Sequence, residues 1–415
     1  MKRLAALALL LCGFISAADP PQPMLSPPLS EARKTQATGP FFFLLMRRSQ
    51  TAATVNRVKK FFCLSLLGAL LVPAISGKTP HVYPSPLGRL YHGFYWGGVG
   101  TDTHDPTEHD VTSEDIARYE QAVGAKTAWI YFSDNWFESR KFPADMCNWI
   151  RDLGKVPYIR LMLRSDVDQR HAEKEFSLQK IVAGVFDVDL RIWAHEAKNF
   201  GSPILVEWGT EPNGNWFSWN GKWNGGAIEG PARYVAAYRH IVDLMRAEGA
   251  DNLQWVWHVN WLDEPEKSWN RFENYFPGEN YCDWVALSAY GPTTPSTRDG
   301  AESFEFKMRE AYPRLTRIAP NKPVIIAEFG CDLHNRHVSV ARWAREALED
   351  LFSNRWPAII GFCWWNEGWQ NDDHKKHDTD MIILHNVDLI RVFRDEFAKH
   401  TEKIQETPIE MTKHE

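Results

Sequence analysis

The sequence predicts a (β/α)8 (TIM) barrel, formed by a single domain over residues 91–400. Short apolar segments rich in Val, Ile and aromatic residues recur along this region, as in strands that are buried on both faces. Helix-like segments separate them, and no internal repeat or linker interrupts the alternation. A doubly wound sheet is the alternative. It is disfavoured because Gly97-Gly98-Val99-Gly100 lacks the G-x-G-x-x-G spacing of a dinucleotide site.

Eight segments are expected to form the strands: 91–96, 127–132, 156–163, 204–208, 253–259, 284–288, 324–328 and 359–364. Among the helices, 112–121 opens with T-S-E-D, an N-cap followed by acids in the first turn. The segments 232–247 and 338–351 are amphipathic. Residues 77–90 are expected to be a linker and residues 401–415 a polar tail.

The first 76 residues are interpreted as a leader with an export signal. Two apolar runs, 4–15 and 61–72, each follow basic residues and precede small ones, and both are too short to be a typical membrane span. Because two signals in tandem make little sense, we place the true start near Met46. We therefore expect a secreted or periplasmic protein without a stable membrane anchor.

The composition of the chain limits the kinds of partner and ligand that it can be expected to bind. The chain has 415 residues, a net charge of -6 and no basic field, so a nucleic-acid partner is not expected. All 19 tryptophans lie between Trp96 and Trp369, and flat aromatic faces stack well on sugar rings. The cysteines Cys147, Cys282, Cys331 and Cys363 are too few for a disulfide scaffold, and whether any pair bonds stays open. No cofactor or metal spacing is present, and a monomer is expected.

Two glutamates lie at the carboxyl ends of expected strands, where each strand is followed by a loop. Glu211 lies in W-G-T-E-P-N-G-N-W (208–216), just beyond the fourth strand, and Glu328 ends the seventh in V-I-I-A-E-F-G (324–330). Reacting groups of such barrels sit at the carboxyl ends of the strands, and strands four and seven lie nearly opposite each other. The pair is therefore expected to serve a glycosidase, one residue donating a proton and the other attacking the sugar.

Three segments carry a family resemblance. E-P-N-G-N-W-F-S-W (211–219) resembles the E-x-N-G-x-W-x-W signature of glycoside hydrolase family 26, the β-mannanase family of clan A. The segments 322–330 and 282–290 resemble its seventh and sixth strands. The resemblance implies Glu211 as acid/base and Glu328 as nucleophile. It also implies that Trp216 and Tyr290 line the site, that Tyr290 bonds the nucleophile, and that Trp364 or Trp365 forms the floor under the cleaved sugar.

Further substrate contacts are expected from three residues, each with a structural alternative. Asn213 is a sugar ligand or a turn residue, Trp219 a stacking platform or core, and His258 a subsite group or a structural hydrogen-bonder. The family has histidine where this chain has Thr210, which leaves mannose recognition open. Tyrosine and backbone donors are expected to keep Glu328 ionised.

One ion pair is also expected. By the alternation of side chains along a strand, Glu207 is expected to point to the same side as Glu211, into the barrel. Arg160 of the third strand is expected to be its countercharge.

The sequence thus indicates a secreted, retaining glycoside hydrolase that cleaves β-linked polysaccharide or oligosaccharide, with endo-β-1,4-mannanase as the first candidate. A mixed-linkage β-glucanase or β-xylanase on the same scaffold is the next. A catalytically silent glycan-binding barrel is the candidate from another class, which retention of both glutamates disfavours.

Overall fold

The computed structural model describes residues 80–97, 111–408 and 410–412, all within one compact unit. The expected leader, 1–76, and the start of the expected linker, 77–79, lie outside the described residues. Within the described residues, no helix combines the length and the apolar character needed to cross a membrane.

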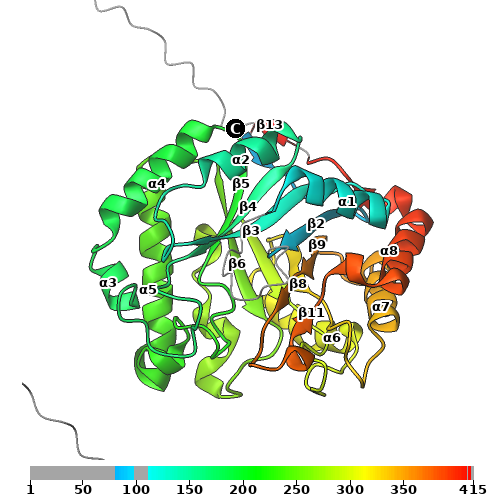
Figure 1. The fold of residues 1–415 in the computed structure, drawn as a ribbon. Coiled ribbons are helices and arrows are strands. Elements are labelled where there is room, and N and C mark those ends of the chain that lie inside the picture. Colours follow the sequence, from blue (N-terminus) through cyan, green and yellow to red (C-terminus); the bar gives the residue numbers. More distant parts are fainter. Residues whose placement is uncertain (1–79, 98–110, 409, 413–415) are drawn as a thin grey trace, which may run out of the picture. The chain divides into compact units, whose positions relative to one another are not determined.

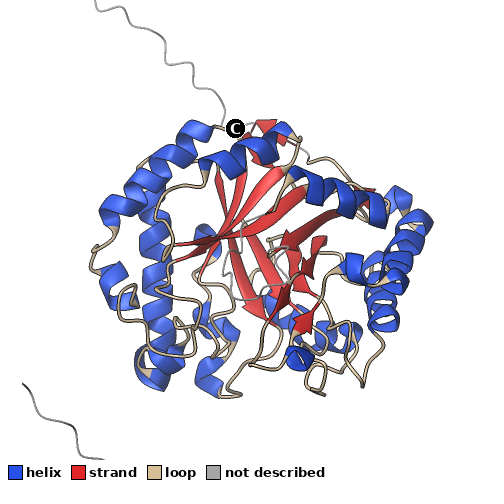
Figure 2. Cartoon of the chain, viewed as in Figure 1, coloured by secondary structure: helices blue, strands red, loops and turns tan. Residues whose placement is uncertain are grey.

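Eight parallel strands form a closed barrel, which confirms the predicted fold. Each strand pairs with the next along the chain, and the first pairs with the last. The strands lie at the centre with helices around them (Figure 1, Figure 2). They are β2 (Leu90–Trp96), β3 (Trp129–Asn135), β4 (Val156–Met162), β5 (Ile204–Trp208), β6 (Leu253–Asn260), β7 (Trp284–Ser288), β8 (Val324–Phe329) and β9 (Ile359–Asn366).

Helices fill every connection except the one between β6 and β7, where the chain forms three short 3-10 turns instead. These turns are η2 (Ser268–Asn270), η3 (Phe272–Tyr275) and η4 (Glu279–Tyr281). The helices are α1 (Ser113–Val123), α2 (Ala144–Asp152), α3 (Leu178–Val182), α4 (Asp187–Phe200), α5 (Gly226–Ala247), α6 (Phe304–Ile318), α7 (Val340–Phe352) and α8 (Val387–Lys399).

Helix α1 begins after the N-cap that its sequence indicates and extends to Val123, beyond the expected end at Gln121. The Thr112 side chain accepts a hydrogen bond from the Asp115 amide, and the Asp115 carboxylate accepts one from the Thr112 amide. Gly124 ends the helix in the left-handed conformation, with φ of 78°. The expected N-cap is therefore confirmed.

Side chains of the strands form two separate layers. One cluster fills the barrel interior, and a larger one packs the outer face of the strands against the helices. The indole of Trp129 crosses the interior beside two glycines. A Cβ on Gly93 would lie 1.9 Å from its Nε1, and one on Gly361 2.3 Å from its Cη2, so only glycine fits at either position. This aromatic interior supports the residues at the cleft above it.

Short strands also form where a linker and a polar tail were expected. β1 (Pro80–Val82) pairs antiparallel with β13 (Glu410–Thr412), and β12 (Ile404–Gln405) adds to the start of β2. These backbone pairings carry no strong side-chain pattern, which is why the sequence did not reveal them. A further pair, β10 (Gly368–Trp369) and β11 (Thr379–Asp380), follows β9 at the cleft. The four described cysteines are buried and free.

Candidate active site

Glu211 occupies a constrained loop position just beyond β5. Gly209 has φ of 66° and its carbonyl accepts a hydrogen bond from the Tyr234 hydroxyl at 2.9 Å. Glu211 itself has φ of 46°, unusual for a residue with a side chain, and its amide donates to the His258 carbonyl at 2.9 Å. The side chain is 5% exposed, and the Trp216 indole donates to its Oε2 at 2.6 Å. The loop thus fixes both the backbone and the carboxylate of Glu211.

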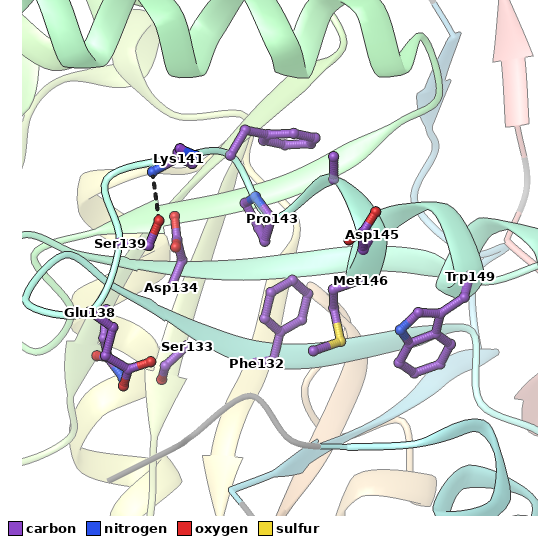
Figure 3. Close-up of a pocket in the computed structure, with 13 residues that line it drawn as sticks. Phe132, Ser133, Asp134, Glu138, Ser139, Lys141, Pro143, Asp145, Met146 and Trp149 are labelled. Atoms are coloured by element: carbon purple, nitrogen blue, oxygen red, sulfur yellow. Dashed lines mark hydrogen bonds between the residues drawn. The ribbon is translucent and has the colours of Figure 1, made fainter.

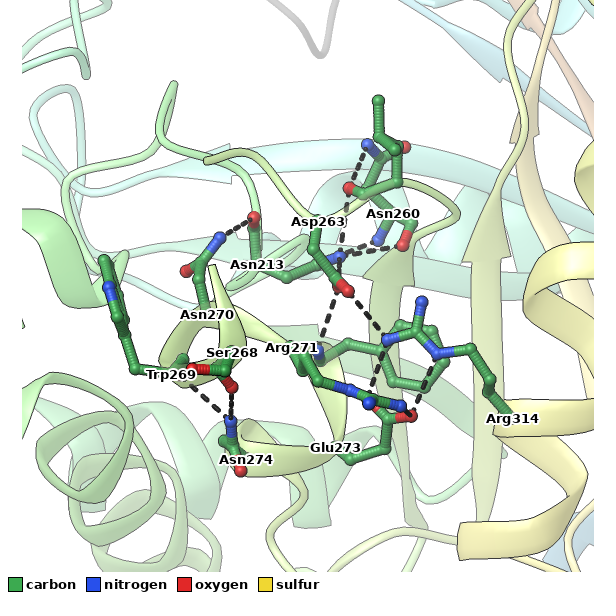
Figure 4. A network of polar contacts seen from close by, with 12 residues as sticks. Asn213, Asn260, Asp263, Ser268, Trp269, Asn270, Arg271, Glu273, Asn274 and Arg314 are labelled. Atoms are coloured by element: carbon green, nitrogen blue, oxygen red, sulfur yellow. Dashed lines mark hydrogen bonds and ion pairs between the residues drawn. The ribbon is translucent and has the colours of Figure 1, made fainter. Parts of the chain in front are cut away.

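Asn213 holds this loop against the end of β6, so the structure supports its structural alternative. Its side-chain amide donates to the carbonyls of Asn260 and Leu262 and to Asp263 Oδ1, and its oxygen accepts from the Asn260 amide at 3.0 Å. Figure 4 shows these contacts as part of a longer polar network. Because the side chain is fully buried with its hydrogen-bonding groups occupied, it is not placed to bind sugar, contrary to the expectation.

Trp219 also differs from the expectation. Its indole donates to the Thr210 carbonyl at 2.7 Å, and its ring stacks on Phe217 at 4.6 Å between centroids. Only 2% of the residue is exposed, and it belongs to the outer core rather than to the cleft. Trp219 therefore supports the loop from behind, while Phe217 and Trp216 face the cleft.

Glu328 reaches the barrel mouth through an irregularity in β8. The register against β9 shifts between Ile326 and Phe329, and the register against β7 shifts beside Ser288. Such a shift re-aims side chains, so Ala327 and Glu328 both face the barrel interior although they are adjacent. Glu328 is 3% exposed.

Tyrosines hold the Glu328 carboxylate. The Tyr290 hydroxyl donates to Oε2 at 2.8 Å, and the Tyr131 hydroxyl lies 3.3 Å from Oε1. Arg160 Nε lies 4.0 Å from the same Oε1, and its guanidinium sits over the rings of Phe217 and Trp365. The expected contact between Tyr290 and Glu328 is thus present.

Glu328 does not have the low pKa that its hydrogen-bond donors alone would give. Burial and the carboxylates of Glu211 and Glu207 raise its pKa to about 7, against the opposing charges of Arg160 and His258. A carboxyl group with a pKa of about 7 is partly protonated at neutral pH, so the expectation that Glu328 stays ionised is not met.

A buried ion pair lies beneath the two glutamates. His258 Nδ1 is 3.0 Å from Glu207 Oε2, and the hydroxyls of Tyr131 and Tyr158 donate to the Glu207 carboxylate at 2.5 and 2.7 Å. Burial raises the pKa of Glu207, but His258 and the two tyrosines lower it overall. Burial lowers the pKa of His258, but Glu207 and the other carboxylates raise it overall. Each group of the pair therefore favours the charged form of the other.

Two expectations change at this pair. The expected inward orientation of Glu207 is present, but its countercharge is His258, whereas Arg160 lies beside Glu328. His258 is 1% exposed, and both its ring nitrogens are occupied, Nδ1 by Glu207 and Thr210 and Nε2 by Ser288 at 2.8 Å. It lies under the cleft and does not reach a sugar subsite, which supports its structural alternative.

Ligand atoms of Glu207, His258 and Glu328 lie within 4.8 Å of one another, a spacing that a metal ion could use. Their mutual hydrogen bonds and the neighbouring tyrosines account for this proximity without an ion. The donor set also includes a histidine whose Nε2 already faces a hydroxyl. The arrangement is better described as an ion-pair network than as a metal centre.

Of the two tryptophans at the end of β9, Trp365 faces the cleft. Its ring stacks on Tyr95 with centroids 3.5 Å apart, and its indole donates to Glu367 Oε2 at 2.8 Å. Trp364 points to the opposite side of the strand, packs against Phe393 of α8 and is fully buried. Trp364 therefore does not line the site, because neighbouring residues of a strand alternate between faces.

The cleft has a volume of about 620 Å³, and sequence reasoning missed several of its residues. Arg164 and Arg170 follow β4, and Asp299 and Gly300 follow β7, in loops without a motif that announces them. Leu262 belongs to the β6–β7 connection. The complete lining consists of Arg160, Arg164, Arg170, Glu211, Trp216, Phe217, Asn260, Trp261, Leu262, Tyr290, Gly291, Thr293, Asp299, Gly300, Trp365, Glu367 and Trp369.

A separate hollow of about 420 Å³ lies between the end of β3 and α2 (Figure 3). Phe132, Met146 and Trp149 form its apolar part. Asp134 is buried there, and burial raises its pKa to about 7 although the Trp193 indole donates to it at 2.9 Å. This hollow shares no lining residue with the cleft.

Comparisons with known proteins agree with this geometry. The model of glycosyl hydrolase family 26 matches residues 173–330, which contain both glutamates. Endoglucanase H of Acetivibrio thermocellus is 30% identical over 222 residues, or 53% of this chain and 23% of that protein. Mannan endo-1,4-beta-mannosidase of Bacillus subtilis is 22% identical over 307 residues, or 74% of this chain and 71% of that protein. The chain thus spans less than a quarter of the first relative's length.

A solved structure shares the fold. The endo-beta-1,4-mannanase double mutant of Cellulomonas fimi superposes with a TM-score of 0.55 at 17% identity, covering 77% of this chain and 72% of that one.

Proposed function

Because the chain belongs to glycosyl hydrolase family 26, we propose that it is a retaining glycoside hydrolase that cleaves internal β-1,4 linkages of mannan. The observation that carries this proposal is geometric: Glu211 lines the cleft together with Tyr290, whose hydroxyl donates to the buried Glu328 carboxylate at 2.8 Å. The relative from Bacillus subtilis, which matches most of this chain, is named for mannan.

In the proposed first step, a Glu328 oxygen forms a bond to the anomeric carbon while the bond to the leaving oxygen breaks. Glu211 gives its proton to that oxygen, and a glycosyl ester of Glu328 remains. In the second step, Glu211 takes a proton from water, the water oxygen attacks the same carbon, and Glu328 leaves as a carboxylate. Two inversions retain the configuration.

The surrounding residues suit these steps. Tyr290 and Tyr131 keep their protons, because burial and the nearby carboxylates raise their pKa well above the usual range. Tyr290 can therefore donate to Glu328 throughout the working pH range. Trp365, held by Tyr95 and Glu367, lines the cleft in which the sugar would bind.

A β-glucan is the second candidate substrate. Endoglucanase H has the higher identity of the two relatives, and Thr210 replaces the histidine that the mannanase signature carries. Release of reducing ends from mannan, mixed-linkage β-glucan and β-xylan separates these candidates. Fastest release from mannan supports the proposal, and release from β-glucan alone overturns its substrate. If the protein binds these polymers and cuts none of them, it is a silent glycan-binding barrel.

We also propose that the enzyme is exported. The basic and apolar pattern of the first 76 residues supports export, with cleavage near Ser76 or Gly77. Amino-terminal sequencing of protein recovered from the medium or periplasm tests this proposal. Protein that stays in the cytoplasm with an intact amino terminus contradicts it.

A further inference from the structure

Two hollows of the surface meet at Trp261 and Leu262, which line both. The first is the cleft, of about 620 Å³. The second, of about 530 Å³, lies between the β6–β7 connection and the first turns of α6. Both volumes fall in the range of ~300–1,000 Å³ that is typical of small-molecule sites. A linear ligand that leaves the cleft over Trp261 therefore enters the second hollow.

Two aromatic rings form a corner of this path. The Phe306 and Trp261 rings lie 6.4 Å apart at 78° to each other, and Phe306 is 47% exposed. The ammonium group of Lys307 lies over the Trp261 ring at 5.2 Å and is itself held by the carbonyls of Gly300 and Glu302. The Trp261 ring is thus fixed by the protein. A single exposed aromatic residue is ordinary, but one that continues an aromatic cleft is not.

The rim of the second hollow carries balanced charge. Its exposed ionic groups are two acids, Glu266 and Glu310, and two bases, Lys267 and Arg271. Arg314 also lines the hollow, and it forms ion pairs with Asp263 and Glu273 at 2.7 Å each (Figure 4). A hollow with balanced polar groups and aromatic faces suits a neutral, hydroxyl-rich ligand better than an ion.

We propose that the second hollow is a distal subsite, which binds a sugar unit of the same polysaccharide chain beyond the cleft, with Trp261 and Phe306 as stacking faces. The inference rests on the proposed function and deepens it, because a subsite outside the cleft favours long substrates. Aromatic contact with a distant unit strengthens binding of a chain that is long enough to reach it.

The experiment compares kcat/KM across β-1,4-manno-oligosaccharides of increasing length. The wild-type value should rise steeply when the chain becomes long enough to reach Phe306. In Phe306→Ala, the ratio of long-chain to short-chain kcat/KM should fall by about tenfold, or about 1.4 kcal/mol. Phe306→Trp should restore the ratio because it restores an aromatic face. The matched control is Val387→Ala, which removes an apolar side chain that is 70% exposed on α8 and should keep the wild-type ratio.

The outcomes separate the inference from the function on which it rests. Cleavage at all lengths with an unchanged ratio in Phe306→Ala overturns the distal subsite and leaves the mannanase proposal standing. A ratio lowered equally by Phe306→Ala and Phe306→Trp also overturns the stacking role. Wild-type protein that cleaves no manno-oligosaccharide overturns the function and the subsite together.

Discussion

His258 and Glu207 form an ion pair below the cleft, with Nδ1 3.0 Å from Oε2 and both side chains buried. Tyr131 connects this pair to Glu328, because its hydroxyl donates to Glu207 Oε1 at 2.5 Å and lies 3.3 Å from Glu328 Oε1. The candidate nucleophile is therefore in contact with a buried network whose members do not line the cleft.

Glu207→Gln should destabilise the protein by about 3–5 kcal/mol, because it leaves His258 buried without its countercharge. Equilibrium unfolding in urea at neutral pH measures this change. The matched control is Asp388→Asn, which breaks an exposed pair with Arg391 and should cost less than about 1 kcal/mol. A Glu207→Gln variant as stable as the control would show that the pair is not charged.

Glu328→Gln should stabilise the protein at high pH. The pKa of this buried acid is raised from 4.5 to about 7, so the folded state holds its proton more tightly than the unfolded state. That contribution is present below pH 4.5 and is lost as pH rises towards 7, a cost of about 3 kcal/mol. The stability gain of the variant over wild type should therefore be larger at pH 8 than at pH 4. An equal gain at both values would contradict the raised pKa.

The acid limb of the activity profile should move to lower pH in Glu211→Gln. Part of the raised pKa of Glu328 comes from Glu211, so Glu211→Gln should lower it and keep the nucleophile ionised at lower pH. An aryl β-mannoside with a very acidic leaving group needs no proton donor, and kcat/KM on this substrate gives the profile. An acid limb that stays near pH 7 in the variant would contradict the coupling of the two carboxylates.

Tyr290→Phe should lower kcat/KM by about 10–100-fold. The lost hydrogen bond reaches a charged group, and such bonds contribute about 1.5–3 kcal/mol. Steady-state kinetics measure the loss, and circular dichroism checks the fold. Tyr281→Phe, which removes a hydroxyl bonded to the peripheral Asp243, is the control and should keep wild-type kinetics.

Asn213→Ala should slow cleavage of substrates that need acid assistance and spare those that do not. Asn213 positions the Glu211 loop and does not face the cleft, so its effect reaches the reaction through the acid. The measurement is kcat for aryl glycosides of graded leaving-group pKa, whose dependence should steepen. Asn274→Ala, in the exposed part of the same network, should keep the wild-type slope. A uniform loss on every leaving group would indicate general damage.

The sequence was sufficient to predict the barrel, and to place Glu211 just beyond β5 and Glu328 near the end of β8. Alternating apolar segments predict buried parallel strands, and the β5 and β7 bounds match the structure to the residue. The helix missing between β6 and β7 could not be foreseen, because the 3-10 turns there depend on contacts with distant residues. One such contact is Arg314 of α6 with Glu273.

Side-chain placement at the mouth was harder to foresee. Neighbouring residues of a strand point to opposite faces, so the sequence places Trp364 and Trp365 on different faces of their strand. It does not show which of the two faces the cleft. Glu328 does not follow this alternation, because the register of β8 shifts beside it. No local sequence pattern marks the shift. Asn213 and His258 are polar and near the glutamates, but their partners lie about 50 residues away along the chain, so only the fold reveals that they are fully bonded.

The most direct test of the central claim is the anomeric configuration of the first product, followed by proton NMR during the first minutes of polysaccharide cleavage. With Glu328 as nucleophile and Glu211 as acid/base, the new reducing end should appear first as the β-anomer and mutarotate afterwards. Initial appearance of the α-anomer would mean a single displacement by water, and it would contradict the roles assigned to both glutamates.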